Sequence, residues 1–352
     1  DEGMINYMNA AIGVTPDRPI LIDRFLNHAL ECEADAISDG THAFVPAVME
    51  HIELAGVHSG DSACILPSVH ISEDNVKTIK EYTRKIAEEM GVKGLMNMQY
   101  AIENNKVYVL EANPRASRTV PLVSKVCNIR MVPLATEIIT SELTGNPSPV
   151  PALKEQVIPN YGVKEAVFPF NMFQEVDPIL GPEMRSTGEV LGLSSSYGEA
   201  FFKAQEATQS KLPLEGTVLI SVNKKDKDEV AEVAKMFHKN GFKIVATGGT
   251  YDLISAAGVP AEKVHKVSDG HRPNTLDLIT NGKVDLIVNS PIGKDSVNDD
   301  SYLRKAAIKG KIPYMTTIAA AKATAEGIAQ LKTHGNSEVK SLQELHAEIH
   351  DK

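Results

Sequence analysis

Apolar side chains recur at helical spacing in the stretch bounded by Ser72 and Gly91. Ser72 is a favourable N-cap with acidic residues after it, and Gly91 is a favourable helix end. Two strand-like stretches, roughly 93–102 and 106–112, come next, with the polar turn 103–105 between them. The apolar stripe of the helix is Val76, Ile79, Thr83, Ile86 and Met90. This order predicts a β-hairpin with one long helix packed beside it.

Prolines interrupt the pattern at 144–151, where the sequence reads Thr-Gly-Asn-Pro-Ser-Pro-Val-Pro. Alternating prolines cannot continue a helix, so this stretch is predicted to be a connector. We expect three parts: residues 1–145, a connector over 146–212 whose strand and helices complete the first unit, and a separate unit over 213–352.

Strand-like and helix-like stretches alternate after Gly216. The strand-like stretches are 217–222, 242–247, 284–289 and 312–315. Repeated β-α units predict a parallel sheet covered by helices on both faces.

The net charge of the 352 residues is −10, which argues against nucleic-acid binding because such proteins usually present a basic face. No apolar run approaches the length of a membrane span. Cys32, Cys64 and Cys127 lie far apart and lack CxxC spacing, so the sequence predicts neither a disulfide framework nor a zinc site. We therefore expect a protein of the reducing cytoplasm. The chain begins Asp-Glu-Gly and is expected to be part of something longer.

The hairpin carries the first candidate chemistry. Glu111 and Asn113 are two residues apart and so are expected on one face of the strand, together with Val107 and Val109. Gln99 on the partner strand is expected beside them. Carboxylate and amide oxygens suit Mg²⁺, and the following Pro-Arg-Ala-Ser-Arg, which includes Arg118, would hold phosphoryl oxygens. The alternative is an exposed hairpin end with solvated polar residues.

Polar residues also crowd the stretch 49–63, with glycines on either side of His58 and Ser59. His51, Glu53, His58 and Asp61 are candidates for nucleotide contacts, ion ligands or acid-base groups. Earlier in the chain, Glu31 is either a charge on a helix face or a ribose-binding carboxylate.

The C-terminal unit has a candidate site of its own at 246–250, Ala-Thr-Gly-Gly-Thr, where a strand turns into a helix. Such a turn converges backbone N–H groups on one point and suits a phosphate. Ser221 and Asn289 end neighbouring strands at the same expected edge, and Lys227 and Lys266 are candidate sources of positive charge. The alternative is a tight turn without a ligand.

Four stretches together resemble the carbamoyl phosphate synthetase large-chain family, in its second ATP-grasp half: 49–63, 94–99 (Gly-Leu-Met-Asn-Met-Gln), 111–121 and 181–189 (Gly-Pro-Glu-Met-Arg-Ser-Thr-Gly-Glu). The tail from Gly216 onward is similar to the methylglyoxal-synthase-like regulatory domain that ends those chains. The resemblance covers nearly the whole length. It implies an α/β fold, in which the C-terminal lobe of an ATP-grasp domain precedes a parallel-sheet domain.

The resemblance implies an ATP-dependent ligase that phosphorylates carbamate to make carbamoyl phosphate for pyrimidine and arginine synthesis. It implies Mg²⁺ or Mn²⁺ at Gln99, Glu111 and Asn113, with Arg118 contacting phosphate. It also implies a K⁺ ion near His51. The residues it places at ATP are Glu31, Gly56, Val57, His58, Ser59, Gln99 and Glu111.

The amino-terminal ATP-grasp lobe, the first synthetase half and the glutamine-hydrolysing small subunit of the family are absent from this sequence, so this chain alone is expected to be inactive.

The regulatory domain of the family binds the inhibitor UMP or the activator IMP. The matching positions are Ser221, Lys227, Thr247, Thr250, Lys266 and Asn289. Pro291 stands where some relatives have threonine, which leaves the choice of effector open. An ornithine-activator site of enteric relatives matches Glu53, Asp61, Glu165, Tyr314 and Thr316.

Two other functions stay open at this point. One is a methylglyoxal-synthase-type lyase with Asp295 as general base, although Lys322 falls where that enzyme would carry an acidic residue. The other is a non-catalytic oligomerisation module, since the large chains of this family associate through the regulatory region.

Overall fold

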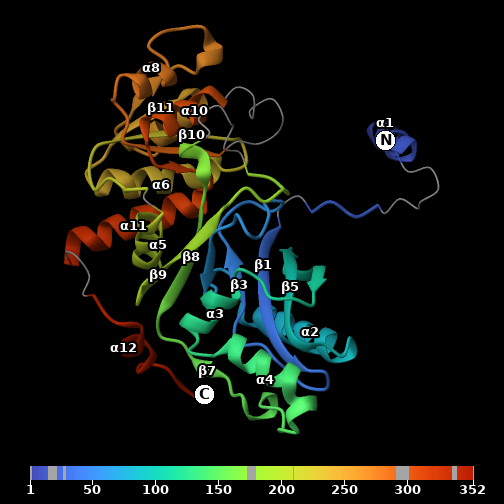
Figure 1. Cartoon of the computed structure of the whole chain (residues 1–352). Coiled ribbons are helices and arrows are strands. Elements are labelled where there is room, and N and C mark those ends of the chain that lie inside the picture. Colours follow the sequence, from blue (N-terminus) through green and yellow to red (C-terminus); the bar gives the residue numbers. More distant parts are fainter. Residues whose placement is uncertain are drawn as a thin grey trace.

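The computed structural model of the chain describes residues 2–14, 22–26, 29–172, 180–208, 210–290, 301–334 and 339–351. Figure 1 shows two sheets, one central and one in the upper left of the view. The first has eight strands in the order β6-β5-β1-β3-β4-β8-β9, with β2 paired to β1. Its strands are β1 Leu30–Asp39, β2 Ala43–Phe44, β3 Met49–His51, β4 Cys64–Leu66, β5 Lys93–Glu103, β6 Lys106–Asn113, β8 Tyr161–Val167 and β9 Gly188–Ser194.

The helices described within residues 2–208 lie before or within the predicted connector 146–212. They are α1 Glu2–Val14, α2 Glu73–Glu89, α3 Val120–Val126, α4 Met131–Thr144 and α5 Tyr197–Ala207, with 3-10 turns η1 Val150–Ala152 and η2 Pro169–Asn171. The Ser72 hydroxyl accepts from the Asn75 N–H and caps α2, as the sequence predicts. The β5-β6 turn places Asn104 and Asn105 at positive φ, 51° and 59°, which suits a tight hairpin.

The second sheet has the order β12-β11-β10-β13-β14, and its pairings are parallel, as the alternating pattern predicts. Its strands are β10 Thr217–Val222, β11 Lys243–Thr247, β12 Glu262–Val264, β13 Leu286–Ser290 and β14 Tyr314–Met315. The helices of this part are α6 Lys227–Lys239, α7 Gly248–Ala256, α8 Thr275–Thr280, α10 Ser301–Gly310, α11 Ile318–His334 and α12 Leu342–His346, with the 3-10 turn η3 Val267–Asp269.

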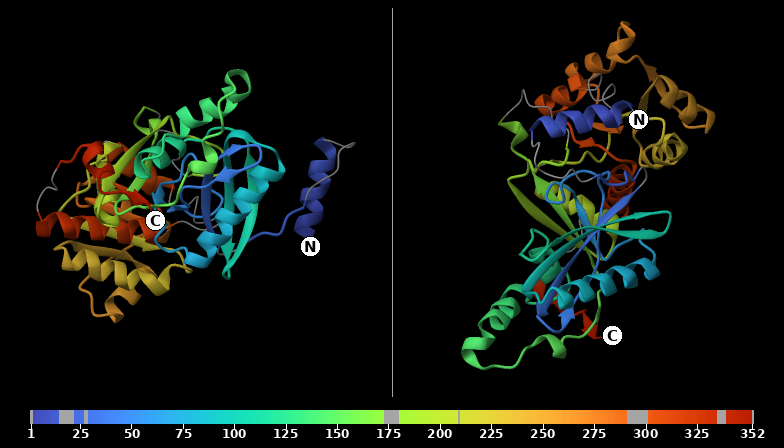
Figure 2. Two further views of the ribbon diagram at one scale, coloured as in Figure 1. Left: turned by 90° about the horizontal axis from the view of Figure 1, so that it is seen from below. Right: turned by 90° about the vertical axis from the view of Figure 1, so that its right-hand side faces the viewer.

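The C-terminal segment returns to the first unit, far from the parallel sheet (Figures 1 and 2). β15 His350–Asp351 pairs with β7 Gln156–Val157. The Asn160 amide donates to Glu348 Oε2 at 2.8 Å, and a His346 ring nitrogen lies 2.6 Å from Lys125 O. The predicted unit 213–352 is therefore tied to the first part of the chain by its own last residues.

Helix α5 joins the two parts, because it packs on β9 and β8 on one side and on α11 on the other. A Cβ built on Gly192 would lie 2.0 Å from Ala200 O, and one on Gly327 would lie 2.4 Å from Gly198 O. Both contacts are with backbone, which has little room to move. One hydrophobic cluster runs through this junction, from Val163 of β8 to Ile328 of α11.

Among the described residues, none of the helices has the length and apolar character needed to cross a bilayer.

We expect Gly192→Ala to lower the free energy of unfolding by about 1–3 kcal/mol, because the new methyl group overpacks the β9-α5 contact. Urea unfolding followed by circular dichroism measures this. Gly188→Ala on the same strand is the control, since a Cβ there meets nothing within 4 Å. Equal stability of the two variants would contradict the close packing.

Candidate functional site

The β5-β6 hairpin brings its three predicted metal ligands to one face. Gln99 pairs with Glu111, and Asn97 pairs with Asn113. Directly opposite residues in antiparallel strands share a face, as do residues two apart, so Gln99, Glu111 and Asn113 lie together. The prediction that these side chains are neighbours is thus met by the geometry.

One expectation about this hairpin was wrong. A β-bulge shifts the register between Gln99 and Tyr100, so that Val109 pairs with Tyr100 and Val107 with Ile102. The extra residue, Leu110, reverses the alternation. Val107 and Val109 therefore lie on the opposite face from Glu111. Simple counting along the strand cannot detect a bulge.

The donor set of the hairpin fits a hard divalent cation. The Gln99 Nε2 donates to Ser59 Oγ at 2.9 Å, which leaves the Gln99 amide oxygen for another partner. The Asn113 side chain has a buried amide nitrogen without a hydrogen-bond partner in the described structure. One carboxylate and two amide oxygens are ligands that Mg²⁺ or Mn²⁺ accepts.

Arg118 follows the hairpin in sequence and is held by the stretch 181–189. Its Nη1 donates to Ser186 Oγ at 2.6 Å, and its Nε lies 3.8 Å from Glu189 Oε2. The Arg118 side chain is 29% exposed. In the sequence, residues 181–189 carry part of the family resemblance but have no predicted task. In the fold, Ser186 and Glu189 of this stretch contact Arg118 and hold its side chain.

The loop after β3 carries the residues expected at ATP. The Gly56 N–H donates to Glu31 Oε1 at 2.9 Å, and the His58 N–H donates to Gly181 O at 2.8 Å. Glu31 is on strand β1, so the reading of Glu31 as a helix-face charge was wrong. Val57 lies between these two anchors, and Ser59, which follows them, accepts a hydrogen bond from Gln99. The fold therefore joins the loop to the hairpin.

Asp35 is a buried residue that sequence reasoning missed. Its Oδ1 accepts from Ser117 Oγ at 2.8 Å and from the Asn97 amide at 3.0 Å, and its Oδ2 accepts from Thr119 Oγ1 at 2.7 Å. These bonds fix both neighbours of Arg118. Burial, reinforced by the nearby Glu33 charge, raises the pKa of Asp35 to about 6.

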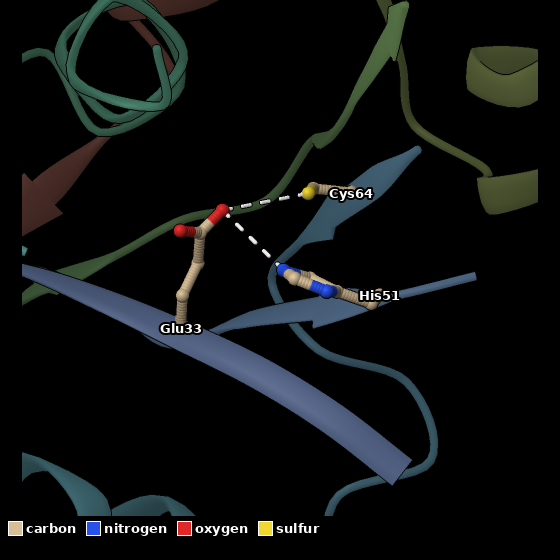
Figure 3. Close-up of side chains that lie close together, drawn as sticks. All are labelled: Glu33, His51 and Cys64. Atoms are coloured by element: carbon tan, nitrogen blue, oxygen red, sulfur yellow. Dashed lines mark hydrogen bonds and ion pairs between the residues drawn. The ribbon is translucent and has the colours of Figure 1, made fainter. Parts of the chain in front are cut away.

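A second group of buried ionisable side chains lies below the loop. Glu33 of β1, His51 of β3 and Cys64 of β4 point toward one another (Figure 3). Burial raises the pKa of Glu33, but contacts with His51, Lys164 and Asn97 lower it below its usual value. Burial lowers the pKa of His51, but Cys64 and the two neighbouring glutamates raise it well above its usual value.

Sequence reasoning named His51 from this group but not Glu33 or Lys164. A signal for Glu33 was present: in β1 the polar residues Glu31, Glu33 and Asp35 alternate with small apolar ones, which gives the strand a polar face. Lys164 is 1% exposed, and its ammonium donates to Ser59 O at 3.2 Å.

The fold gives separate partners to the carboxylates expected at ornithine. Asp61 accepts from the N–H groups of Arg185 and Ser186 at 2.7 and 2.9 Å, and Glu53 accepts from the Ala63 N–H at 2.6 Å. Glu165 accepts from the Gln205 amide at 2.7 Å. Burial raises the pKa of Glu53 to about 7, and burial with the Glu53 charge raises the pKa of Glu165 to about 8.

The carboxyl edge of the parallel sheet gathers the residues expected at the effector. Thr247 Oγ1 donates to Ser221 Oγ at 2.8 Å, and the Asn289 amide donates to Ser221 O at 3.0 Å. Thr250 Oγ1 accepts from the Val222 N–H at 3.3 Å. A small cavity of about 10 Å³ is lined by Ser221, Thr247, Lys266, Val267, Ser268, Thr275 and Leu303.

Lys227 also reaches this edge, because its Nζ would lie 2.8 Å from a Cβ on Gly249. Pro291 and Asp295 lie outside the described residues. Lys322 of α11 pairs with Glu229 and Glu232 of α6, at 2.7 and 3.1 Å.

The loop after β14 links the two sites. The Tyr314 hydroxyl donates to Asn289 Oδ1 at 2.5 Å, and Thr317 Oγ1 donates to Ile52 O at 3.2 Å. Thr316 lies between these contacts. The C-terminal unit thus touches the first unit at the residue preceding Glu53.

Two family models match the chain. They are the carbamoyl-phosphate synthase L chain ATP-binding domain, over residues 1–143, and the MGS-like domain, over residues 229–316. The carbamoyl phosphate synthase large chain, C-terminal section, of Aquifex aeolicus is 45% identical over 98% of this chain and 67% of its own length.

The carbamoyl phosphate synthase large chains of Gemmatimonas aurantiaca and Archaeoglobus fulgidus are 48% and 47% identical over 97% and 99% of this chain. Only 31% and 32% of their own lengths are matched, so the chain spans about a third of these relatives. On its matched domains and its identity along nearly the whole length, the chain belongs to the carbamoyl phosphate synthase large-chain family.

Proposed function

We propose that this chain supplies the C-terminal lobe of the site where ATP phosphorylates carbamate to carbamoyl phosphate, together with the regulatory domain of the same enzyme. The observation that carries the proposal is the hairpin cluster of Gln99, Glu111 and Asn113, with Arg118 held beside it. Carbamoyl phosphate so made would serve pyrimidine and arginine synthesis in the cytoplasm.

Each residue has a definite task in this reaction. Glu111 and the amide oxygens of Gln99 and Asn113 would hold Mg²⁺ or Mn²⁺, which when bound offsets charge on the phosphates. Arg118, positioned by Ser186, would contact the phosphoryl group being transferred. The loop from Gly56 to Ser59, with Glu31, would hold the adenosine. Catalysis would then consist mainly of positioning and charge neutralisation.

The partners of the site are the remainder of the large chain and the glutamine-hydrolysing small subunit. The amino-terminal lobe of an ATP-grasp site covers the nucleotide from the other side, so we propose that this chain alone is inactive. A K⁺ ion near His51 and self-association through the regulatory domain complete the assembly that the family resemblance implies.

We expect Glu111→Gln, made in a complete large chain bearing this segment, to lower kcat for carbamoyl phosphate synthesis by about 10²–10³-fold, as when one group that stabilises transition-state charge is lost. The rate of carbamoyl phosphate formation at saturating bicarbonate and ammonia measures it. Glu137→Gln, on the exposed face of α4, is the matched control. Unchanged kcat in Glu111→Gln would refute the metal assignment.

The carboxyl edge of the parallel sheet is our proposed site for UMP or IMP. Ser221, Thr247 and Thr250 offer hydroxyls there, Asn289 offers an amide, and Lys227 and Lys266 offer positive charge to a phosphate. The contact of Thr317 with Ile52 would let binding at this edge act on the ATP loop.

Titration calorimetry of the chain with UMP and with IMP should give saturable binding of one of them. Thr250→Ala should weaken it about tenfold, as for one hydrogen bond to a charged phosphate worth about 1.5 kcal/mol. Thr333→Ala, exposed on α11, should leave affinity unchanged. Absence of binding at millimolar concentrations of both nucleotides would reduce this edge to a structural role.

We further propose that ornithine binds at Glu53, Asp61, Glu165, Tyr314 and Thr316.

Because the pKa values of Glu53 and Glu165 are raised to about 7 and 8, each must lose a proton before it can pair with an ammonium group. Ornithine affinity should therefore rise between pH 6 and 8, by about tenfold per pH unit for each proton released. Calorimetry at several pH values tests this, and Glu165→Gln should flatten the rise. Affinity that falls over this range would contradict it.

A further inference from the structure

The cluster of Glu33, His51 and Cys64 has no task in the phosphoryl transfer or effector binding proposed above. The three side chains come from the adjacent strands β1, β3 and β4, and each is at least 96% buried. Their candidate ligand atoms all lie within 4.8 Å of one another, and Figure 3 shows them converging on one point. A carboxylate, an imidazole and a thiol are the side chains that bind zinc in proteins.

The spacing of these atoms matches two edges of a zinc tetrahedron. Zn–N and Zn–O bonds of about 2.0–2.1 Å and a Zn–S bond of about 2.3 Å give edges of about 3.3–3.4 Å for N···O and about 3.5 Å for O···S. In the structure, His51 Nε2 lies 3.4 Å from Glu33 Oε1, and Cys64 Sγ lies 3.6 Å from the same oxygen. The N···O distance is longer than the roughly 2.7–2.9 Å of a charge-assisted hydrogen bond.

The imidazole has no hydrogen bond of good geometry in the part of the chain that the structure describes, at either ring nitrogen. Its two contacts with carboxylate oxygens are long ion pairs, 3.4 Å from Nε2 to Glu33 Oε1 and 3.6 Å from Nδ1 to Glu31 Oε2. The Nε2 is aimed at the Glu33 and Cys64 atoms (Figure 3). A buried nitrogen with only such a long contact favours a ligand between the three side chains.

Outer contacts orient the same atoms as they do in metal sites. His51 Nδ1 lies 3.6 Å from Glu31 Oε2, on the other side of the ring from the cluster. The Asn97 amide donates to Glu33 Oε2 at 3.0 Å, which leaves Oε1 for the cluster. A carboxylate behind a ligating histidine and a hydrogen bond to a ligating carboxylate are typical of such sites.

Charge and donor chemistry select the ion. A divalent cation would replace the protons that the thiol and the imidazole carry without it, and with a thiolate, a carboxylate and a neutral imidazole these three side chains and the ion would together be neutral, as burial favours. Potassium takes oxygen ligands, and this cluster offers one oxygen, one nitrogen and one sulfur, so the K⁺ ion proposed near His51 would need oxygen ligands outside the cluster. The Lys164 ammonium nearby donates to Ser59 O and Gly60 O, at 3.2 and 3.5 Å.

From these observations we propose that Glu33, His51 and Cys64 form a buried Zn²⁺ site with three protein ligands, which joins β1, β3 and β4 next to the loop of residues 54–62. Three protein ligands leave a fourth position for water. The Ser62 hydroxyl, two residues before Cys64, is also buried without a hydrogen-bond partner in the described structure.

The test uses the chain itself and needs no catalytic activity. After removal of metals with a chelator, the chain should take up one Zn²⁺ per molecule, measured by mass spectrometry of the metal content. Cobalt in place of zinc should give a thiolate-to-metal charge-transfer band. Cys64→Ser should abolish that band and weaken Zn²⁺ binding by at least about 100-fold, beyond the roughly 10–100-fold of losing an outer-shell partner.

Cys127→Ser is the matched control, because Cys127 is also buried but lies after α3 and is not among the grouped side chains of Glu33, His51 and Cys64. It should keep the band and the stoichiometry. Glu33→Gln provides a second variant if Cys64→Ser fails to fold, and it too should lose tight Zn²⁺ binding. No charge-transfer band in the unaltered chain, or a band that survives in Cys64→Ser, would overturn the proposal.

Discussion

The close approach of α5 to strand β9 and to helix α11 is the constraint on which the arrangement of the molecule depends. It is allowed by glycine at Gly192, Gly198 and Gly327, where a Cβ would fall within 3 Å of neighbouring backbone. Because α5 belongs to the first unit and α11 to the second, the two sheets share one hydrophobic cluster. The absence of a Cβ at these three glycines therefore allows the close packing that sets the position of the regulatory unit against the ATP-binding unit.

Buried or partly buried carboxylates accept hydrogen bonds from the loops of the proposed ATP site. Glu31 accepts from Gly56, Asp61 accepts from the backbone of 185–186, and Asp35 accepts from Ser117 and Thr119. Each acts on backbone or hydroxyl donors that would otherwise lack a partner, and bonds to an ionised acceptor are the stronger kind. The residues proposed to contact ATP can therefore be exposed and still be held in place by these hydrogen bonds.

The two candidate sites are connected through a short stretch after β14. Tyr314 contacts Asn289 at the edge proposed to bind the effector, and Thr317 contacts Ile52 next to the buried acids of the first unit. Only two residues, Met315 and Thr316, separate Tyr314 from Thr317 along the chain. A shift of β14 on effector binding would be passed directly to the strand that carries His51, and no long relay of side chains is required.

The sequence by itself determined the elements and the family. Periodicity located α2, the β5-β6 hairpin and the parallel strands because each pattern reflects a local repeat of 3.6 or 2 residues. Spaced motifs placed Gln99, Glu111 and Asn113 together because hairpin pairing is nearly local. Only the tertiary structure revealed the bulge at Leu110, the hold of Ser186 on Arg118, and the meeting of Glu33, His51 and Cys64. Those features depend on contacts between residues far apart in the chain, and such contacts leave no period in the sequence.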